Sequence, residues 1–81
     1  MKPSVIREYV RSLNDNDYMF LLRRLRTKFS GDQGEALDLI SKNPSMDKVF
    51  SSAKSAEDIY NLIDSLYSQL ERDYSRRVPN E

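Results

Sequence analysis

The sequence predicts an all-α protein, a compact bundle of four or five short helices in one domain that spans residues 1–81. Apolar residues recur at spacings of three and four almost throughout, as they do on one face of a helix. Only two glycines interrupt this pattern. A chain of 81 residues has room for one hydrophobic core, and we expect a stability of about 4–12 kcal/mol. Residues 1–3 and 77–81 are expected to fray.

The first two predicted helices span about residues 4–13 and 17–29. The apolar face of the first consists of Val5, Ile6, Tyr9, Val10 and Leu13. The stretch "NDND" at 14–17 supplies capping and turn residues between the two helices. The second helix carries a stripe at helical spacing formed by Tyr18, Leu21, Leu22, Leu25 and Phe29.

The second half of the chain predicts three further helices after a loop at "SGDQG", residues 30–34. A helix at about 35–43 is ended or kinked by Pro44, and Ser45 can cap a short helix at 45–53. These two elements could also form one bent helix. Ser55 and Asp58 resemble a capping box, which begins a last helix at about 56–75.

Composition excludes several classes of function. The chain has no Cys and no His, which excludes thiol catalysis, disulfides, zinc sites built from these residues and imidazole bases. Thirteen basic residues balance thirteen acidic ones, which argues against a general binder of polyanions. The carboxylates show no pattern of nucleophile or metal partners, so we expect neither an enzyme nor a cofactor. No signal peptide or long apolar run is present, and we expect a soluble, intracellular protein.

Three tyrosines, Tyr60, Tyr67 and Tyr74, recur every seven residues along the last helix. At about 100° per residue they line one edge of a broad apolar face that includes Ile63. A tyrosine at such an edge can bury its ring and keep its hydroxyl in water. The edge therefore suits either the boundary of the core or the rim of a binding groove between the last helix and the second one.

The second predicted helix carries another candidate surface. Phe20 lies off the apolar stripe, between Arg23 and Arg24, and is expected either to pack on the first helix or to be exposed. Arg23, Arg24, Arg26 and Lys28 form a basic run. Cations at the end of a helix suit its dipole. They could also contact nucleic acid phosphates, in which case binding should fall steeply with salt.

Four short stretches in the chain are similar to parts of one known domain. They are "FSGDQG" at 29–34, "MDKVFSSA" at 46–53, "KSAEDIY" at 54–60 and "SQLERDYSRR" at 68–77. Together they resemble the KIX domain of transcriptional coactivators, the helical module of CREB-binding protein and of the Mediator tail subunit. Residues 17–29 would take the place of the first KIX helix, so the resemblance extends over about residues 17–77.

The KIX resemblance implies a protein that binds amphipathic helices of transcription regulators in a shallow hydrophobic groove. It implies that Tyr60 anchors the partner, with Ile63 and Tyr67 one and two turns along. Leu22 and Leu25 would supply the opposite wall by position. The chain departs from the family pattern in the extra helix at residues 1–14, in Pro44, and in Asp64 and Glu71, which make the tyrosine edge acidic.

Two other interpretations stay open from the sequence. A small stand-alone regulator of bacterial or phage origin would also be short, helical and free of Cys and His, and "DYMFLLRRLRT" at 17–27 is similar to the Hha family of nucleoid modulators. Such a protein would be cytoplasmic, whereas a KIX-like adaptor would be nuclear. An exposed tyrosine edge would also suit a symmetric homodimer.

Overall fold

The computed structural model describes residues 3–26 and 34–77, and these residues form five α-helices and no strand. The helices are α1 (Pro3–Ser12), α2 (Asp15–Arg26), α3 (Gly34–Ser41), α4 (Pro44–Ser51) and α5 (Ala56–Arg77). The predicted all-α fold is confirmed, and the helix boundaries within the described ranges differ from the predicted ones by two residues at most. The predicted end of the second helix at Phe29 and most of the "SGDQG" loop lie outside the described residues.

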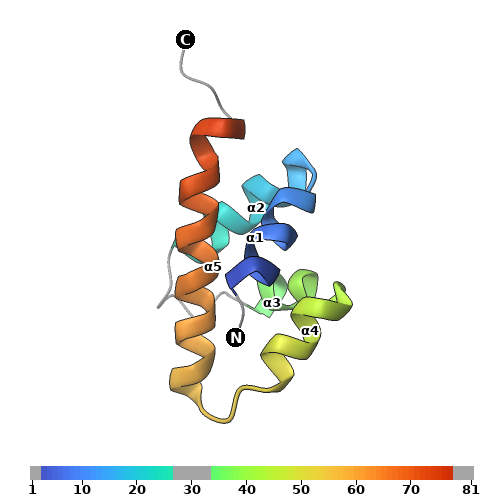
Figure 1. Cartoon of the computed structure of the whole chain (residues 1–81), viewed down its shortest axis with the longest axis vertical. Helices are drawn as coiled ribbons and strands as arrows, with labels where there is room; N and C mark the ends of the chain where they lie inside the picture. The colour runs from blue at the N-terminus through green and yellow to red at the C-terminus, as the bar shows by residue number, and fades with distance from the viewer. Residues whose placement is uncertain (1–2, 27–33, 78–81) are drawn as a thin grey trace.

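The helices pack in a closed cycle. Helix α5 contacts α1 and α2, α1 contacts α4, α4 contacts α3, and α3 contacts α2. Figure 1 shows α5 as the long helix along one side of the molecule, with the four shorter helices beside it. At 1.5 Å per residue, α5 is about 33 Å long and α2 about 18 Å. Because α2 is much shorter, it can cover only part of α5.

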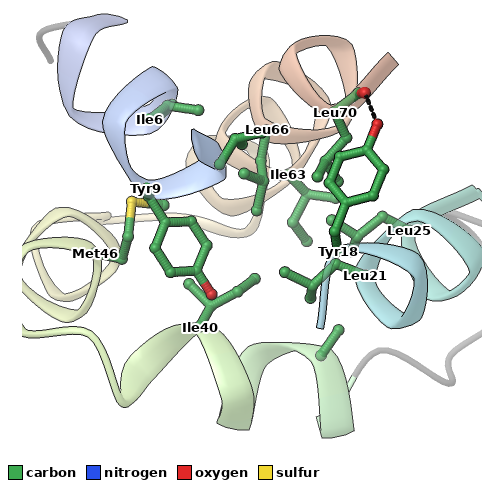
Figure 2. Close-up of a cluster of buried hydrophobic side chains, with 12 residues drawn as sticks. Ile6, Tyr9, Tyr18, Leu21, Leu25, Ile40, Met46, Ile63, Leu66 and Leu70 are labelled. Carbon is green, nitrogen blue, oxygen red and sulfur yellow. Dashed lines mark hydrogen bonds between the residues drawn. The ribbon is translucent and has the colours of Figure 1, made fainter. Parts of the chain in front are cut away.

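The core lies inside this cycle and receives side chains from every helix. Helix α4 contributes Met46 and α5 contributes Ile63, Leu66 and Leu70. Figure 2 shows these side chains meeting Tyr9 of α1 and the leucines of α2. The other members of the core are Ile6, Val10, Tyr18, Leu21, Leu25, Ala36 and Ile40.

Asparagine caps set two of the helix starts. The Asn14 side chain accepts a hydrogen bond of 2.8 Å from the Asp17 amide, so α2 begins at Asp15. Asn43 has extended backbone angles (φ −87°, ψ 119°), as expected before a proline, and its side chain accepts from the Met46 amide at 3.1 Å. Helices α3 and α4 are therefore separate, with Asn43 rather than Ser45 as the cap of α4.

Helix α5 begins with the predicted Ser55–Asp58 pair. The Asp58 amide donates to the Ser55 hydroxyl at 3.2 Å, while the Asp58 carboxylate accepts from the Lys54 amide at 3.0 Å. In a standard capping box this carboxylate would accept from the amide of the cap residue, which is Ser55. Here it accepts from the amide of Lys54, the residue before the cap. At the other end, Arg77 belongs to α5 and its side chain is only 9% exposed, so fraying from residue 77 was a wrong expectation. None of the described helices is long and apolar enough to cross a membrane.

Candidate partner-binding groove

A groove of about 360 Å³ runs between α2 and α5. Helix α2 packs along the C-terminal half of α5, because Tyr18 meets Leu70 and Asp15 meets Arg77. The side chains that flank this contact leave a groove at the surface. Its lining consists of Met19, Leu22, Arg23, Arg26, Tyr67, Glu71 and Tyr74.

The two walls of the α2–α5 groove carry opposite charge. Helix α2 contributes Arg23 and Arg26, and α5 contributes Glu71. All three side chains are exposed. Within residues 3–26 and 34–77, neither arginine forms an ion pair. Aromatic and aliphatic side chains separate the charged walls, so the groove combines an apolar floor with two charged edges.

The structure divides the three tyrosines of the predicted edge. Tyr67 and Tyr74 line the groove, and Tyr74 is 40% exposed. Tyr60 is 52% exposed but lies outside the groove. The reason is length, since α2 runs antiparallel to α5 from the level of Arg77 and its 12 residues reach back to about the level of Leu66. Tyr60 is therefore not among the residues that line this groove, and its expected role as an anchor stays a prediction.

Three leucine and isoleucine positions were expected to line the groove. Leu22 does so. Leu25 and Ile63 are 0% and 2% exposed and belong to the core, where Figure 2 shows them. A partner cannot contact Leu25 or Ile63 unless the bundle opens. These two residues therefore belong to the core beneath the groove and not to its surface.

Phe20 faces α3 and is half-buried, which differs from both predicted placements. It lines a second cleft of about 350 Å³ with Asp17, Glu35, Asp38, Leu39 and Lys42. The Arg24 guanidinium lies 5.4 Å from the centre of the Phe20 ring and pairs with Glu35 at 3.2 Å. Phe20 and Arg24 thus contact α3, whereas Arg23, three residues after Phe20, lines the α2–α5 groove.

The arginines of the basic run are likewise divided between two surfaces of α2. Arg23 and Arg26 border the groove, whereas Arg24 is engaged with Glu35 across the α2–α3 contact. Lys28 lies outside the described residues. Arg23 and Arg26 are therefore directed to the groove, and Arg24 to the contact with α3.

A polar cluster joins the ends of α1, α2 and α5, and we call it the junction. The Arg77 guanidinium donates to the carbonyls of Val10 at 2.8 Å and Leu13 at 2.6 Å, and to Asp15 at 3.2 Å. Its Nε donates to Asp73 at 3.1 Å. The carbonyls at the end of a helix lack partners within the helix, so Arg77 caps the C-terminus of α1.

Tyr18 and Asp73 complete the junction. The Arg77 guanidinium stacks 4.5 Å from the centre of the Tyr18 ring, and the Tyr18 hydroxyl donates to the Leu70 carbonyl (Figure 2). Asp73 is 4% exposed and is the one charged residue among the described ones in the core. Hydrogen bonds from Arg76 and Arg77 lower the pKa of Asp73 against the effect of its burial. Burial and the Asp73 charge raise the pKa of Tyr18.

Sequence reasoning missed Asp73 and Arg77, although a signal was present. The core positions Leu66 and Leu70 are followed by Asp73 and Arg77 at steps of three and four. Two charged residues thus continue the apolar stripe of α5, and a spacing of four allows them to pair on one helix face. A stripe that changes from apolar to charged near a helix end indicates a buried ion pair.

No group of three or more His, Cys, Asp or Glu that could hold a metal ion occurs in the described ranges. Comparisons with protein-family models, curated proteins and solved structures found no match to this chain.

Proposed function

We propose that the protein is a non-enzymatic protein-binding module whose α2–α5 groove receives an amphipathic helix of a partner. The observation that carries this proposal is the groove itself, an apolar floor between a basic wall and an acidic wall. Aromatic residues, methionine and arginine are enriched at the surfaces where proteins bind one another. Tyr67, Tyr74, Met19 and the two wall arginines supply this composition.

The shape of the groove favours a helix as the ligand. Two neighbouring helices form its walls, and an amphipathic helix can lay its apolar face between them. Tyr67 and Tyr74 are two turns apart on α5, about 10 Å along its axis. A partner helix with apolar residues at positions i, i+3 or i+4, and i+7 places its anchors at matching intervals.

The charges of the groove walls determine which charged residues are favoured on either side of the apolar face of the partner helix. Arg23 and Arg26 favour acidic residues along one side of its apolar face. Glu71 favours a basic residue on the other side. The acidic side agrees with the KIX resemblance, in which the partners are transcription regulators with acidic amphipathic helices. In this proposal Tyr67 and Tyr74 are the anchors in place of Tyr60.

The proposal is tested by titrating ¹⁵N-labelled protein with a synthetic acidic amphipathic peptide at physiological ionic strength. We expect amide shifts to cluster at Met19, Leu22, Arg23, Tyr67 and Tyr74. Spectra that do not move, or shifts that gather elsewhere on the bundle, would remove the groove as a binding site for such helices.

Variants distinguish docking in the groove from packing. Arg23→Glu and Tyr74→Ala should each weaken peptide binding about tenfold or more, because hot-spot residues at interfaces are typically aromatic or arginine. Tyr60→Ala and Arg72→Glu are the matched controls, since both residues are exposed on α5 and lie outside the groove. Equal loss in the controls would show that the groove is not the site.

A further inference from the structure

We propose that the α2–α5 groove is also a self-complementary surface, through which two copies of this chain form a symmetric dimer. This inference concerns the same groove as the proposed function but does not require a foreign partner. It follows from the opposite charge of the two walls, which are Arg23 and Arg26 on α2 and Glu71 on α5. A surface with one basic and one acidic edge can be its own complement.

Symmetry determines which residues meet. In a two-fold dimer the same patch is used by both copies, and residue i of one contacts residue j of the other, and the reverse. A two-fold axis that runs along the groove brings each α2 wall opposite the α5 wall of the second copy, at the same level along the axis. Arg23 then meets Glu71 of the second copy, and Glu71 meets its Arg23, which gives two identical pairs.

The floor of the groove supplies apolar area for the same contact. Tyr74, with 40% of its surface exposed, and Tyr67 line one side, and Met19 and Leu22 line the other. The same rotation places the tyrosines of one copy against Met19 and Leu22 of the second. The chain has no net charge, so two copies approach without overall repulsion.

Self-association and partner binding would then exclude each other, because both cover the same residues. A ligand that binds only the monomer has an apparent affinity reduced by the fraction of protein that is monomeric. The dimer would therefore be a resting form that a partner helix must displace. Dimer formation, however, can be tested without any peptide.

The first experiment is sedimentation velocity of the full 81-residue chain across a range of protein concentrations at low salt. The mass should rise from 9.5 kDa toward twice that value as concentration increases. Salt should shift the equilibrium back toward the monomer, since exposed charge pairs are screened. A chain that stays monomeric up to about millimolar concentration, where even a weak interface associates, would overturn the proposal.

Charge reversal tests the predicted pairs directly. Arg23→Glu places two glutamates opposite each other at both symmetric positions, and Glu71→Arg places two arginines there, so each variant should dimerise at least tenfold more weakly. An equimolar mixture of the two variants should recover the association, because each contact then joins Glu to Arg. The Arg72→Glu variant, reversed at an exposed position outside the groove, should dimerise like the original chain.

The outcomes separate the two proposals. A helical circular dichroism spectrum and a cooperative thermal transition establish that each variant is folded, while the melting temperature itself can fall with the loss of the dimer. If the original chain dimerises but the mixture of variants does not, the dimer uses another surface and this inference fails. If the chain is monomeric yet its groove amides shift with the acidic peptide, the dimer is wrong and the proposed function stands.

Discussion

Arg77 at the junction and Arg23 on the wall of the α2–α5 groove differ in their exposure to water and in the number of their partners. Arg77, at the junction, is 9% exposed and donates to the carbonyls of Val10 and Leu13 and to two carboxylates. Arg23, on the wall of the groove, is exposed and forms no ion pair within the described residues. Arg77 is the last residue of α5, and Arg23 belongs to α2, which packs against the same half of α5.

The difference separates a residue that stabilises the fold from one that is available to a partner. A buried guanidinium needs hydrogen bonds for its donors, because an unsatisfied buried charge costs several kcal/mol. The junction meets that need with partners from α1, α2 and α5. The charged side chains of the groove walls stay exposed to water, so they carry little desolvation penalty. They can therefore pair with the charges of a partner chain. Substitutions at the two sites should therefore affect different properties.

The largest effect is expected for Arg77→Ala. The change removes the cap of α1 and leaves the buried Asp73 with one arginine instead of two, so the free energy of unfolding should fall by about 3–5 kcal/mol. Urea unfolding followed by circular dichroism measures this loss. Arg72→Ala is the matched control on the exposed face of α5 and should change stability by less than about 0.5 kcal/mol. Similar values for the two variants would contradict the assigned role of the junction.

The attachment of α1 can be probed away from the junction through Tyr9. Burial, with a smaller effect of the Asp17 charge, raises the pKa of Tyr9 from 10.0 to about 12. The folded state therefore keeps this proton between pH 10 and 12, where the unfolded state releases it. The contribution of the Tyr9 hydroxyl to the free energy of unfolding is therefore fully present below pH 10. It is lost as the pH rises from 10 through 12, by about 2–3 kcal/mol in total.

Tyr9→Phe tests that pH dependence. The variant has no proton to release at this position, so its stability should fall less than that of the original chain between pH 9 and pH 12. Denaturant unfolding at a series of pH values gives the comparison. Parallel curves for the two proteins would show that Tyr9 is accessible to water in the folded state.

A smaller effect is expected for Tyr18→Phe. The change removes the hydrogen bond to the Leu70 carbonyl and keeps the ring on which Arg77 stacks. A typical intramolecular hydrogen bond contributes about 0.5–1.5 kcal/mol, so unfolding should become easier by that amount. Tyr18→Leu removes the aromatic face as well and should cost more. If the two variants are equally stable, the stacked guanidinium contributes nothing measurable.

The fold was predictable from the sequence because periodicity and caps act locally. The apolar stripe predicted for the second helix includes Tyr18 and Leu21, which the structure buries in the core, whereas Leu25 and Ile63 were expected to line the groove and are buried as well. The junction was not predicted, since Arg77 contacts residues more than sixty positions away. Helical periodicity carries no information about such long-range pairs.

The groove was predictable only in part. The edge position of the tyrosines led to the expectation of a groove between the second and last helices, and the structure has a groove between α2 and α5. The level at which α2 ends on α5 depends on the packing, and this level excludes Tyr60 while retaining Tyr67. The separation of Arg23 from Arg24 follows from the contact of α2 with α3, where Glu35 binds only Arg24 of the two. The periodicity of the second helix alone could not show which of Arg23 and Arg24 contacts α3.

The smallest effect on stability is expected for Arg23→Ala, the same substitution as at Arg77. The side chain is exposed, and alanine is a better helix former than arginine, which offsets the lost interaction with the helix dipole. The free energy of unfolding should change by less than about 0.5 kcal/mol. Peptide binding and self-association should nevertheless both weaken, because in both proposals Arg23 is one of the two wall arginines that pair with acidic residues of the occupant. A loss of stability near that of Arg77→Ala would mean that the groove is held together by its charges. In that case it would be a second junction of the fold and not a surface for a partner.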